Sequence, residues 1–271
     1  MREIRGSLFR AALVASLLLG VAVAAHAQDR TPKPESEQGL TIDDGRWHVL
    51  VGMYGWFPSL SGTVSVRDYV QVPIDVPFSD LWSHLKAVVP AHFEARRDRF
   101  GLGTDLLYIR LGVPIQGNIP EYLGASLDFR SWIVEGFGFY RVAQGHGENP
   151  WIVDLVGGVR YWNVNTRVDA SAGSTNPLTT DWVDGFGGVR LQLPIVGCLS
   201  LLERGDVGAG GAKLDWSASG DLSYRLGKGW VSGLGYKYLS VDYGKQGALG
   251  IDRRVVDVAF SGPRAWIAYT W

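Results

Sequence analysis

The chain has 271 residues, with 26 Lys and Arg against 27 Asp and Glu, so its formal net charge is -1. This near-neutral balance gives no electrostatic basis for binding nucleic acid, which needs a basic surface. A single cysteine excludes an intramolecular disulfide framework and a metal site made of several thiolates. Glycine (36) and aromatic residues are abundant, and beyond the N-terminal region no stretch has the roughly 18 apolar residues of a membrane helix, so we expect many short strands.

The N-terminal region has the three parts of a secretory signal peptide. Arg2, Arg5 and Arg10 are basic, Ala11–Val23 is apolar, and Ala25–Ala27 supplies the small residues of a cleavage site. The alternative, a membrane anchor, is disfavoured because the apolar segment is too short to cross about 30 Å of hydrocarbon. The sequence therefore predicts a signal peptide at 1–27, a flexible polar leader at 28–45 and a folded region at 46–271.

Strict alternation between Leu214 and Leu226 is the clearest structural signal in the folded region. Every even position there is apolar, aromatic or glycine, and every odd position is polar or charged. A period of two over this length predicts a long β-strand with one apolar and one polar face. A similar pattern, less regular, follows from Trp230 to Tyr238.

Short turns alternate with longer connections along the chain, as in transmembrane barrels. We therefore predict an all-β fold: an antiparallel up-and-down transmembrane β-barrel of about ten strands, with eight or twelve as alternatives, and with short periplasmic turns and longer outer loops. The ten predicted strands are Arg46–Phe57, Val88–Arg97, Phe100–Leu111, Gly124–Val142, Trp151–Asp169, Asp181–Leu193, Leu199–Ala209, Ala212–Leu226, Gly229–Tyr243 and Ile251–Trp271.

A soluble β-sandwich or lipocalin-like barrel also shows alternating strands, but with the apolar face inward. Two features favour a membrane barrel instead. Trp and Tyr gather near the strand ends of the apolar face, as in interfacial girdles. Charges recur on the opposite face of nearly every strand, where a packed soluble core would leave them unpaired at a large cost.

The last strand ends on an aromatic residue. Trp271 is preceded by Tyr269 and Ile267 on the same strand face. This pattern resembles the signal by which the barrel assembly machinery recognises its substrates, so Tyr269 and Trp271 are predicted to form an assembly signal. The expected partners are that machinery and outer-membrane lipid.

Six stretches carry a resemblance to a family of outer-membrane β-barrel proteins of Gram-negative bacteria, porin-like in fold. They are Gly55–Pro58 with Leu60–Val64, Val76–Leu81, Gly158–Trp162, Asp181–Asp184, Arg204–Gly208 and Gly235–Leu239. The resemblance covers about residues 46 to 271 and implies the fold and an outer-membrane location. It brings no catalytic or binding residue with it.

If the apolar faces point to lipid, a set of balanced charges must point into the lumen. Such charges either pair across strands and fill the interior, or line a polar bore; their balanced signs give no ion preference. The predicted lumen charge network is Glu94, Arg96, Asp105, Glu135, Arg141, Asp154, Arg160, Asp184, Arg190, Arg204, Asp206, Asp215, Asp221, Arg225, Lys237 and Arg264.

The longest connection, Pro58–Ala87, has structure of its own. It holds two strand-like pieces, Gly62–Val66 and Tyr69–Val76, and an amphipathic turn at Ser79–Lys86 that Ser79 could cap. The turn either packs over the barrel rim or enters the mouth as a plug; if both strand pieces cross the membrane, the strand count becomes twelve. The candidate plug residues are Asp80, Leu81, Trp82, His84 and Leu85.

Enzymatic chemistry has little support in the sequence. His84 with Asp80, and His92 with Glu94, are the pairs that could support acid–base catalysis. No Asp-x-His pair stands on an outer loop, as in omptin proteases, and no histidines have metal-ligand spacing. We expect no catalytic residue, cofactor or metal, and Cys198 is expected to be a free thiol in a periplasmic turn.

Three functions remain open at this point. The first is a barrel without enzymatic activity that is structural or presents its outer loops, as an adhesin or a receptor does. The second is a small, weakly selective pore for small polar solutes. The third is a barrel enzyme with a histidine at its outer rim. A filled lumen favours the first function, and a continuous polar bore favours the second.

Overall fold

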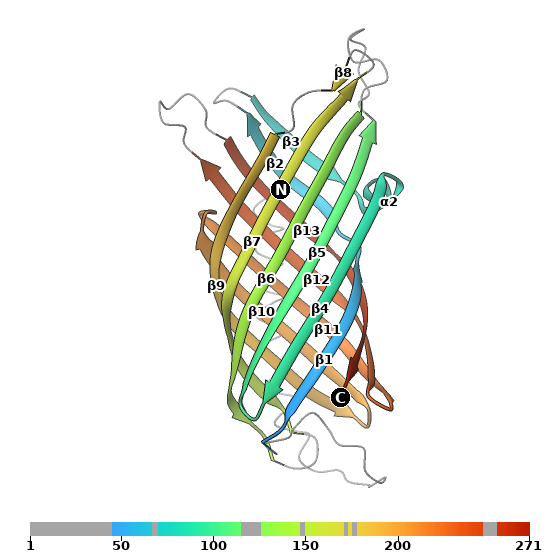
Figure 1. Ribbon diagram of the computed structural model, residues 1–271, viewed down its shortest axis with the longest axis vertical. Coiled ribbons are helices and arrows are strands. Elements are labelled where there is room, and N and C mark those ends of the chain that lie inside the picture. The colour runs from blue at the N-terminus through green and yellow to red at the C-terminus, as the bar shows by residue number, and fades with distance from the viewer. Residues whose placement is uncertain are drawn as a thin grey trace, which may run out of the picture.

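The computed structural model describes residues 45–66, 70–114, 126–146, 150–170, 173–174, 178–245 and 254–271. The predicted signal peptide and nearly all of the leader lie outside these residues, as do the predicted strand ends at Gly124, Ile251 and Tyr69. The described chain folds into a tall antiparallel β-barrel with strongly tilted strands (Figure 1).

All ten predicted strands are present and close the barrel in chain order, which confirms the predicted fold. Two further strands lie at one rim, and a two-residue strand, β8 (Gly173–Ser174), pairs with β7. The ten strands of the barrel are β1 (Trp47–Trp56), β4 (Leu85–Arg97), β5 (Phe100–Pro114), β6 (Ser126–Gln144), β7 (Ile152–Ala170), β9 (Leu178–Val196), β10 (Leu199–Gly210), β11 (Leu214–Gly227), β12 (Trp230–Lys245) and β13 (Arg254–Thr270).

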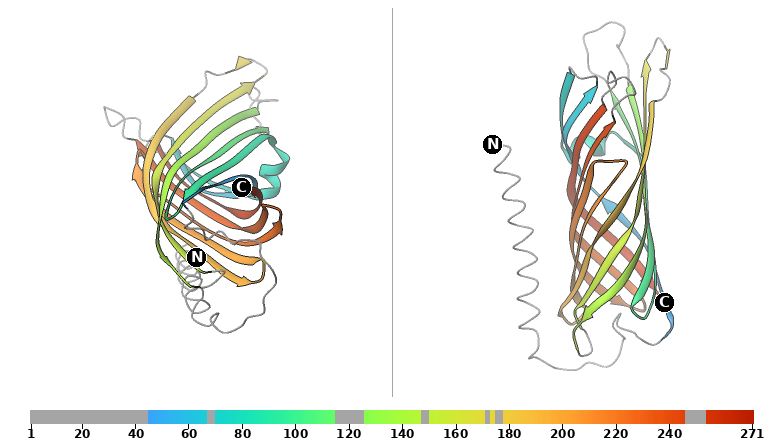
Figure 2. Two further views of the ribbon diagram at one scale, coloured as in Figure 1. Left: turned by 60° about the horizontal axis from the view of Figure 1, so that its bottom comes forward. Right: turned by 90° about the vertical axis from the view of Figure 1, so that its left-hand side faces the viewer.

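Closure occurs between the first and last strands. Leu50 is the register partner of Thr270 on β13 and of Glu94 on β4. If one starts at Leu50 and moves to the register partner on each successive strand, the path around the barrel ends at Gly62 and not at Leu50. This stagger accounts for the strand tilt seen in Figure 2, because shear and tilt are linked in a closed barrel.

The two faces of the wall are divided as the alternation predicts. On β11, Leu222 and Tyr224 are each 50% exposed on the outside, whereas Asp221 and Ser223, which alternate with them, are buried. The outward aromatic residues near the lower rim include Trp47, Phe100, Tyr140, Trp230 and Tyr269. The apolar outer face and its aromatic residues match the lipid-facing belt of a membrane barrel.

The first long connection differs in part from the prediction. Its strand pieces are β2 (Ser59–Val66) and β3 (Val70–Val76), and β2 continues β1 along the upper half of β13. The hairpin therefore extends one rim, and ten strands close the barrel below it. The helix, α2 (Phe78–Ser83), starts before Ser79: its N-cap is Pro77, and no side chain caps it.

A proline explains why the β1–β4 ladder stops early. It ends at Gly52 and His92, so Pro90 is the residue that would face Tyr54. Val49 exchanges backbone hydrogen bonds with Trp271, which follows β13. Because successive residues of a strand bond to opposite sides, Tyr54 directs its backbone groups toward β4. Proline has no N–H to donate there, and the two strands separate above this point.

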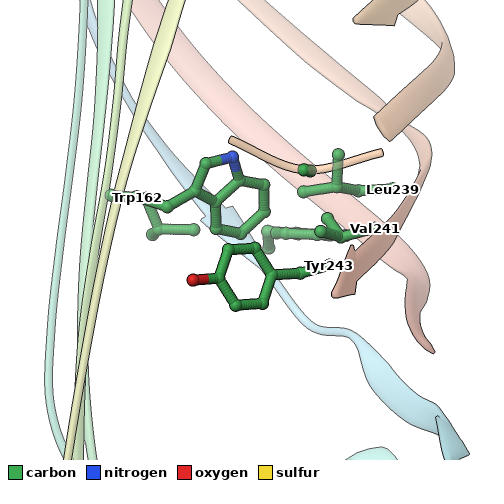
Figure 3. Close-up of a cluster of buried hydrophobic side chains, with 7 residues drawn as sticks. Trp162, Leu239, Val241 and Tyr243 are labelled. Carbon is green, nitrogen blue, oxygen red and sulfur yellow. The ribbon is translucent and has the colours of Figure 1, made fainter. Parts of the chain in front are cut away.

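The interior of the upper barrel is packed with apolar and aromatic side chains. Trp162 from β7 and Leu239, Val241 and Tyr243 from β12 are almost fully buried and meet across the interior (Figure 3). Trp182 stacks on both Trp162 and Tyr243, with ring centroids 5.5 and 4.4 Å apart. Not all large aromatic residues therefore belong to the outer belt, and the upper bore is filled.

Candidate functional site: the charged interior

Arg160 on β7 is the centre of the charged interior, and its side chain is fully buried. Its Nε donates to Glu135 at 2.9 Å, and Nη2 donates to Asp206 at 2.8 Å. Its Nη1 donates to Asp215. Its guanidinium also lies 4.8 Å from the centroid of the Phe186 ring. A buried arginine is tolerated because these three carboxylates offset its charge and accept its hydrogen bonds.

A second cationic group, Arg204 on β10, contacts two of these carboxylates. Its Nη2 donates to Glu135 at 2.9 Å, and its Nε lies 2.9 Å from Asp206. Ser217 donates a further hydrogen bond to Asp206 at 2.8 Å. Since β6 and β10 are separated in the sheet by β7 and β9, the Arg204–Glu135 pair crosses the bore.

Arg190 on β9 forms a second centre. It donates to Glu94 on β4 at 2.5 Å and to Asp154 on β7 at 3.0 Å. Arg96 also donates to Asp154, at 2.5 Å, and both guanidiniums lie over the ring of Phe139. Three strands separate β4 from β9, so Arg190 also bridges opposite walls.

A chain of hydrogen bonds continues from Glu94 to β1. His92 lies 3.2 Å from Glu94 through Nε2 and 3.0 Å from Asp105 through Nδ1. Asp105 in turn accepts a hydrogen bond of 2.6 Å from the Tyr54 hydroxyl. His92 and Glu94 are thus joined as the sequence suggested, but within the charge network.

The remaining predicted lumen residues lie around these centres. Arg264 binds Asp221 through two nitrogens, and the Lys237 ammonium lies 5.4 Å from the Trp56 ring.

Asp184 is held by hydrogen bonds from the Trp182 indole and the Ala212 amide. Arg141 donates to Gln144 near one end of β6, and Arg225 donates to the Gly197 carbonyl at a turn. Sequence parity had assigned all of these residues inward, but it could not pair them.

The candidate plug residues lie on or beside α2, none of whose residues is buried. Phe78 and Trp82 both pack edgewise on Phe57, with ring centroids 5.4 and 5.8 Å apart, and their own rings are tilted to one another at 5.8 Å. Trp82 is 54% exposed. These contacts are those of packing over the rim, and a role as plug remains a prediction.

The histidine next to the helix shows no catalytic pairing with the acid that precedes it. His84 Nδ1 lies 2.6 Å from the backbone carbonyl of Asp80, not from its carboxylate. Within the described ranges no three His, Cys, Asp or Glu residues are placed to hold a metal ion. Cys198 is free and exposed in its turn.

The aromatic C-terminus lies on the outside of the lower rim. Tyr269 contacts Trp230 and Trp271, with ring centroids 5.1 and 5.7 Å apart, and Trp271 exchanges backbone hydrogen bonds with Val49. The side chains of Tyr269 and Trp271 are therefore accessible at the barrel edge, and their role as an assembly signal remains a prediction.

Sequence reasoning missed one group of charged residues because it lies outside the wall. Asp128 and Arg130 of β6 share the outward parity of Trp132, and Arg110 of β5 lies beside Arg130. The alternation of each strand places these residues on the outer face near a strand end. The register that brings them together cannot be derived from the sequence.

Comparisons with known proteins assign this chain to no family. No family model matches the chain, and no curated protein matches it. Among solved structures it is similar to Ail, the attachment invasion locus protein of Yersinia pestis (10% identity, 83% of this chain and 98% of that chain, TM-score 0.38), and to the translocator domain of the autotransporter NalP from Neisseria meningitidis (13%, 96% and 97%, 0.38). A Pseudomonas aeruginosa FadL homologue shows similar values (9%, 84% and 90%, 0.37).

No helix among the described residues has the length and apolar character needed to cross a membrane.

Proposed function

We propose that this chain is an outer-membrane protein without enzymatic activity, whose closed barrel anchors and presents its outer strand ends and loops. The observation that supports this most is the filling of the bore. Arg190 and Arg204 reach carboxylates on distant strands, and the Trp162–Tyr243 cluster packs the level above. A barrel of about this size is narrow enough for side chains to fill it.

Membrane insertion is supported by the outer surface. Leucine, valine and aromatic side chains cover it, including Leu222, Leu234 and Val159, which are at least half exposed. In water such a surface would far exceed the apolar patches that monomeric proteins expose, whereas in a bilayer it faces hydrocarbon. The predicted export signal agrees with an outer-membrane location.

A weakly selective pore is the second candidate, because several arginines of the interior retain some accessibility. Arg190, Arg204 and Arg264 side chains are each about a fifth exposed. Polar solutes could follow such a path only if the ion pairs gave way. The paired, balanced charges favour the closed barrel.

The test is solute permeation into vesicles containing the refolded chain, residues 28–271. A heat-modifiability gel first confirms that the barrel is folded, and an open porin serves as the positive control. Swelling rates in arabinose and in glycine should equal those of protein-free vesicles. Rates that rise with the amount of folded protein would overturn the closed-barrel proposal in favour of the pore.

A further inference from the structure

A compact charged cluster lies on the outer face of the wall, near the upper ends of β4, β5 and β6. Its centre is Asp128, which is only 3% exposed. Arg110 donates to one carboxylate oxygen at 2.7 Å, Arg130 donates to the other at 2.8 Å, and the Lys86 ammonium lies 3.6 Å away. Three cations thus surround one carboxylate.

The cations cover the carboxylate and remain accessible themselves. The Lys86, Arg110 and Arg130 side chains are 47%, 36% and 40% exposed. Asp128 therefore lies under the two guanidiniums and holds them in place, and the surface that faces outward is cationic. In an isolated surface ion pair both charges are solvated to a similar degree, whereas here the cations are exposed and the carboxylate is covered.

The sequence makes room for this arrangement. A Cβ on Gly112 would lie 2.0 Å from Cε of Lys86, so the lysine stem passes directly over this glycine to reach Asp128. A bulge in the β4–β5 register lies between Leu85 and Ala87, at the lysine itself. The next strand adds Arg167, the register partner of Asp128.

The height of the cluster indicates its ligand. Tyr108 and Trp132 pack against each other on the outer face, with tilted rings whose centroids are 4.5 Å apart, and Arg110 and Arg130 lie two residues from them toward the rim. Outward Tyr and Trp mark the interface of a membrane barrel. The cations therefore stand at the level of lipid headgroups, directly above the hydrocarbon.

We propose that Lys86, Arg110 and Arg130 form a binding site for the phosphate of an anionic lipid in the outer leaflet. Arginine forks match phosphate oxygens geometrically, and a fixed set of basic groups at a membrane surface attracts anionic headgroups. The adjacent Tyr108–Trp132 pair would contact the acyl or glycerol part of the same lipid. This inference rests on the proposed membrane location of the barrel.

Native mass spectrometry of the refolded chain, taken from phosphatidylcholine vesicles with added phosphatidic acid, tests the site. Diacylglycerol, which differs by the phosphate alone, is the comparison lipid. Wild type should retain phosphatidic acid roughly tenfold better than the Lys86→Gln/Arg130→Gln variant, since charge-assisted hydrogen bonds are lost. Lys213→Gln is the matched control: this lysine is also half exposed and lies 3.8 Å from a single acid, Asp242, so retention should not change.

Several results would overturn the proposal. Equal retention by wild type and the double variant would remove the site, and equal retention of diacylglycerol would remove the role of phosphate. If inorganic phosphate at matched concentration displaced phosphatidic acid from the wild-type protein, the site would be assigned to free phosphate instead of lipid. If the double variant does not fold, Lys86→Gln alone decides the question, because it leaves both arginines on Asp128. Failure of the chain to enter vesicles at all would instead refute the membrane location.

Discussion

The two charge clusters of this barrel differ in balance and in exposure. Inside, Arg160 meets three carboxylates and is fully buried, and Arg204 also lies within ion-pair distance of two of them. Outside, Asp128 is covered by three cations that stay partly exposed. The comparison indicates that the internal charges hold the walls together, whereas the external cations keep part of their surface exposed, as the proposed lipid site requires.

The largest effect is expected from breaking the internal cluster. Arg160→Met would leave Glu135, Asp206 and Asp215 buried with fewer partners, which costs roughly 3–5 kcal/mol when a buried pair loses one member. Urea unfolding of the refolded chain in neutral vesicles would measure this loss. Arg130→Met is the external control, and because its ion pair is partly exposed its cost should stay below about 1 kcal/mol. Similar costs for both variants would contradict the distinction.

The next effect concerns the two faces of one strand. Leu222→Asp places a charge on the lipid face and should reduce the free energy of unfolding by about 2 kcal/mol or prevent assembly. Ser219→Asp, also on β11, faces inward between its register partners Arg204 and Lys237, which would compensate the new charge. Heat-modifiability gels would separate the two. Equal amounts of folded barrel would show that the assignment of faces is wrong.

A smaller effect is expected where the β1–β4 ladder ends. Pro90→Ala supplies an N–H opposite Tyr54 and should add one backbone hydrogen bond, worth about 1 kcal/mol. The new amide at position 90 should be protected from hydrogen exchange. Rapid exchange of that amide would mean that the strands part for another reason.

The smallest effect is expected for α2. Trp82→Ala removes ring contacts with Phe57 and Phe78, but the helix has no buried residue, so global unfolding should change by less than about 0.5 kcal/mol. Limited proteolysis within 78–83 should become faster. A large global loss would show that α2 is part of the barrel core.

Much of the fold follows from the sequence because the period of two assigns each residue to a face. The run from Leu214 to Leu226 gives β11 and its inward acids directly, and ten such strands suffice for closure. The exact ends of helices and strands are harder to predict. The sequence offers Ser79 as a helix cap, whereas the helix begins at Phe78 and its N-cap is Pro77.

The candidate site was less accessible to sequence reasoning. Parity placed Arg190 and Glu94 in the lumen, but their contact depends on a closed barrel that brings β9 opposite β4. Asp128 and Lys86 lie on different strands, and only the register and the missing side chain of Gly112 bring them together. Aromatic residues also divide between faces: Trp132 is exposed on the outer surface, whereas Trp162 is buried in the interior.

Single-channel conductance of refolded residues 28–271 in a planar bilayer tests the closed bore most directly, because ions are the smallest solutes that could pass. Wild type and a variant lacking Phe78–Ser83 should both be silent, since the internal charge network and the aromatic cluster fill the interior without the helix. Discrete, reproducible steps from wild-type protein shown to be folded would contradict the account. Steps from the deletion variant alone would show that α2 is the plug.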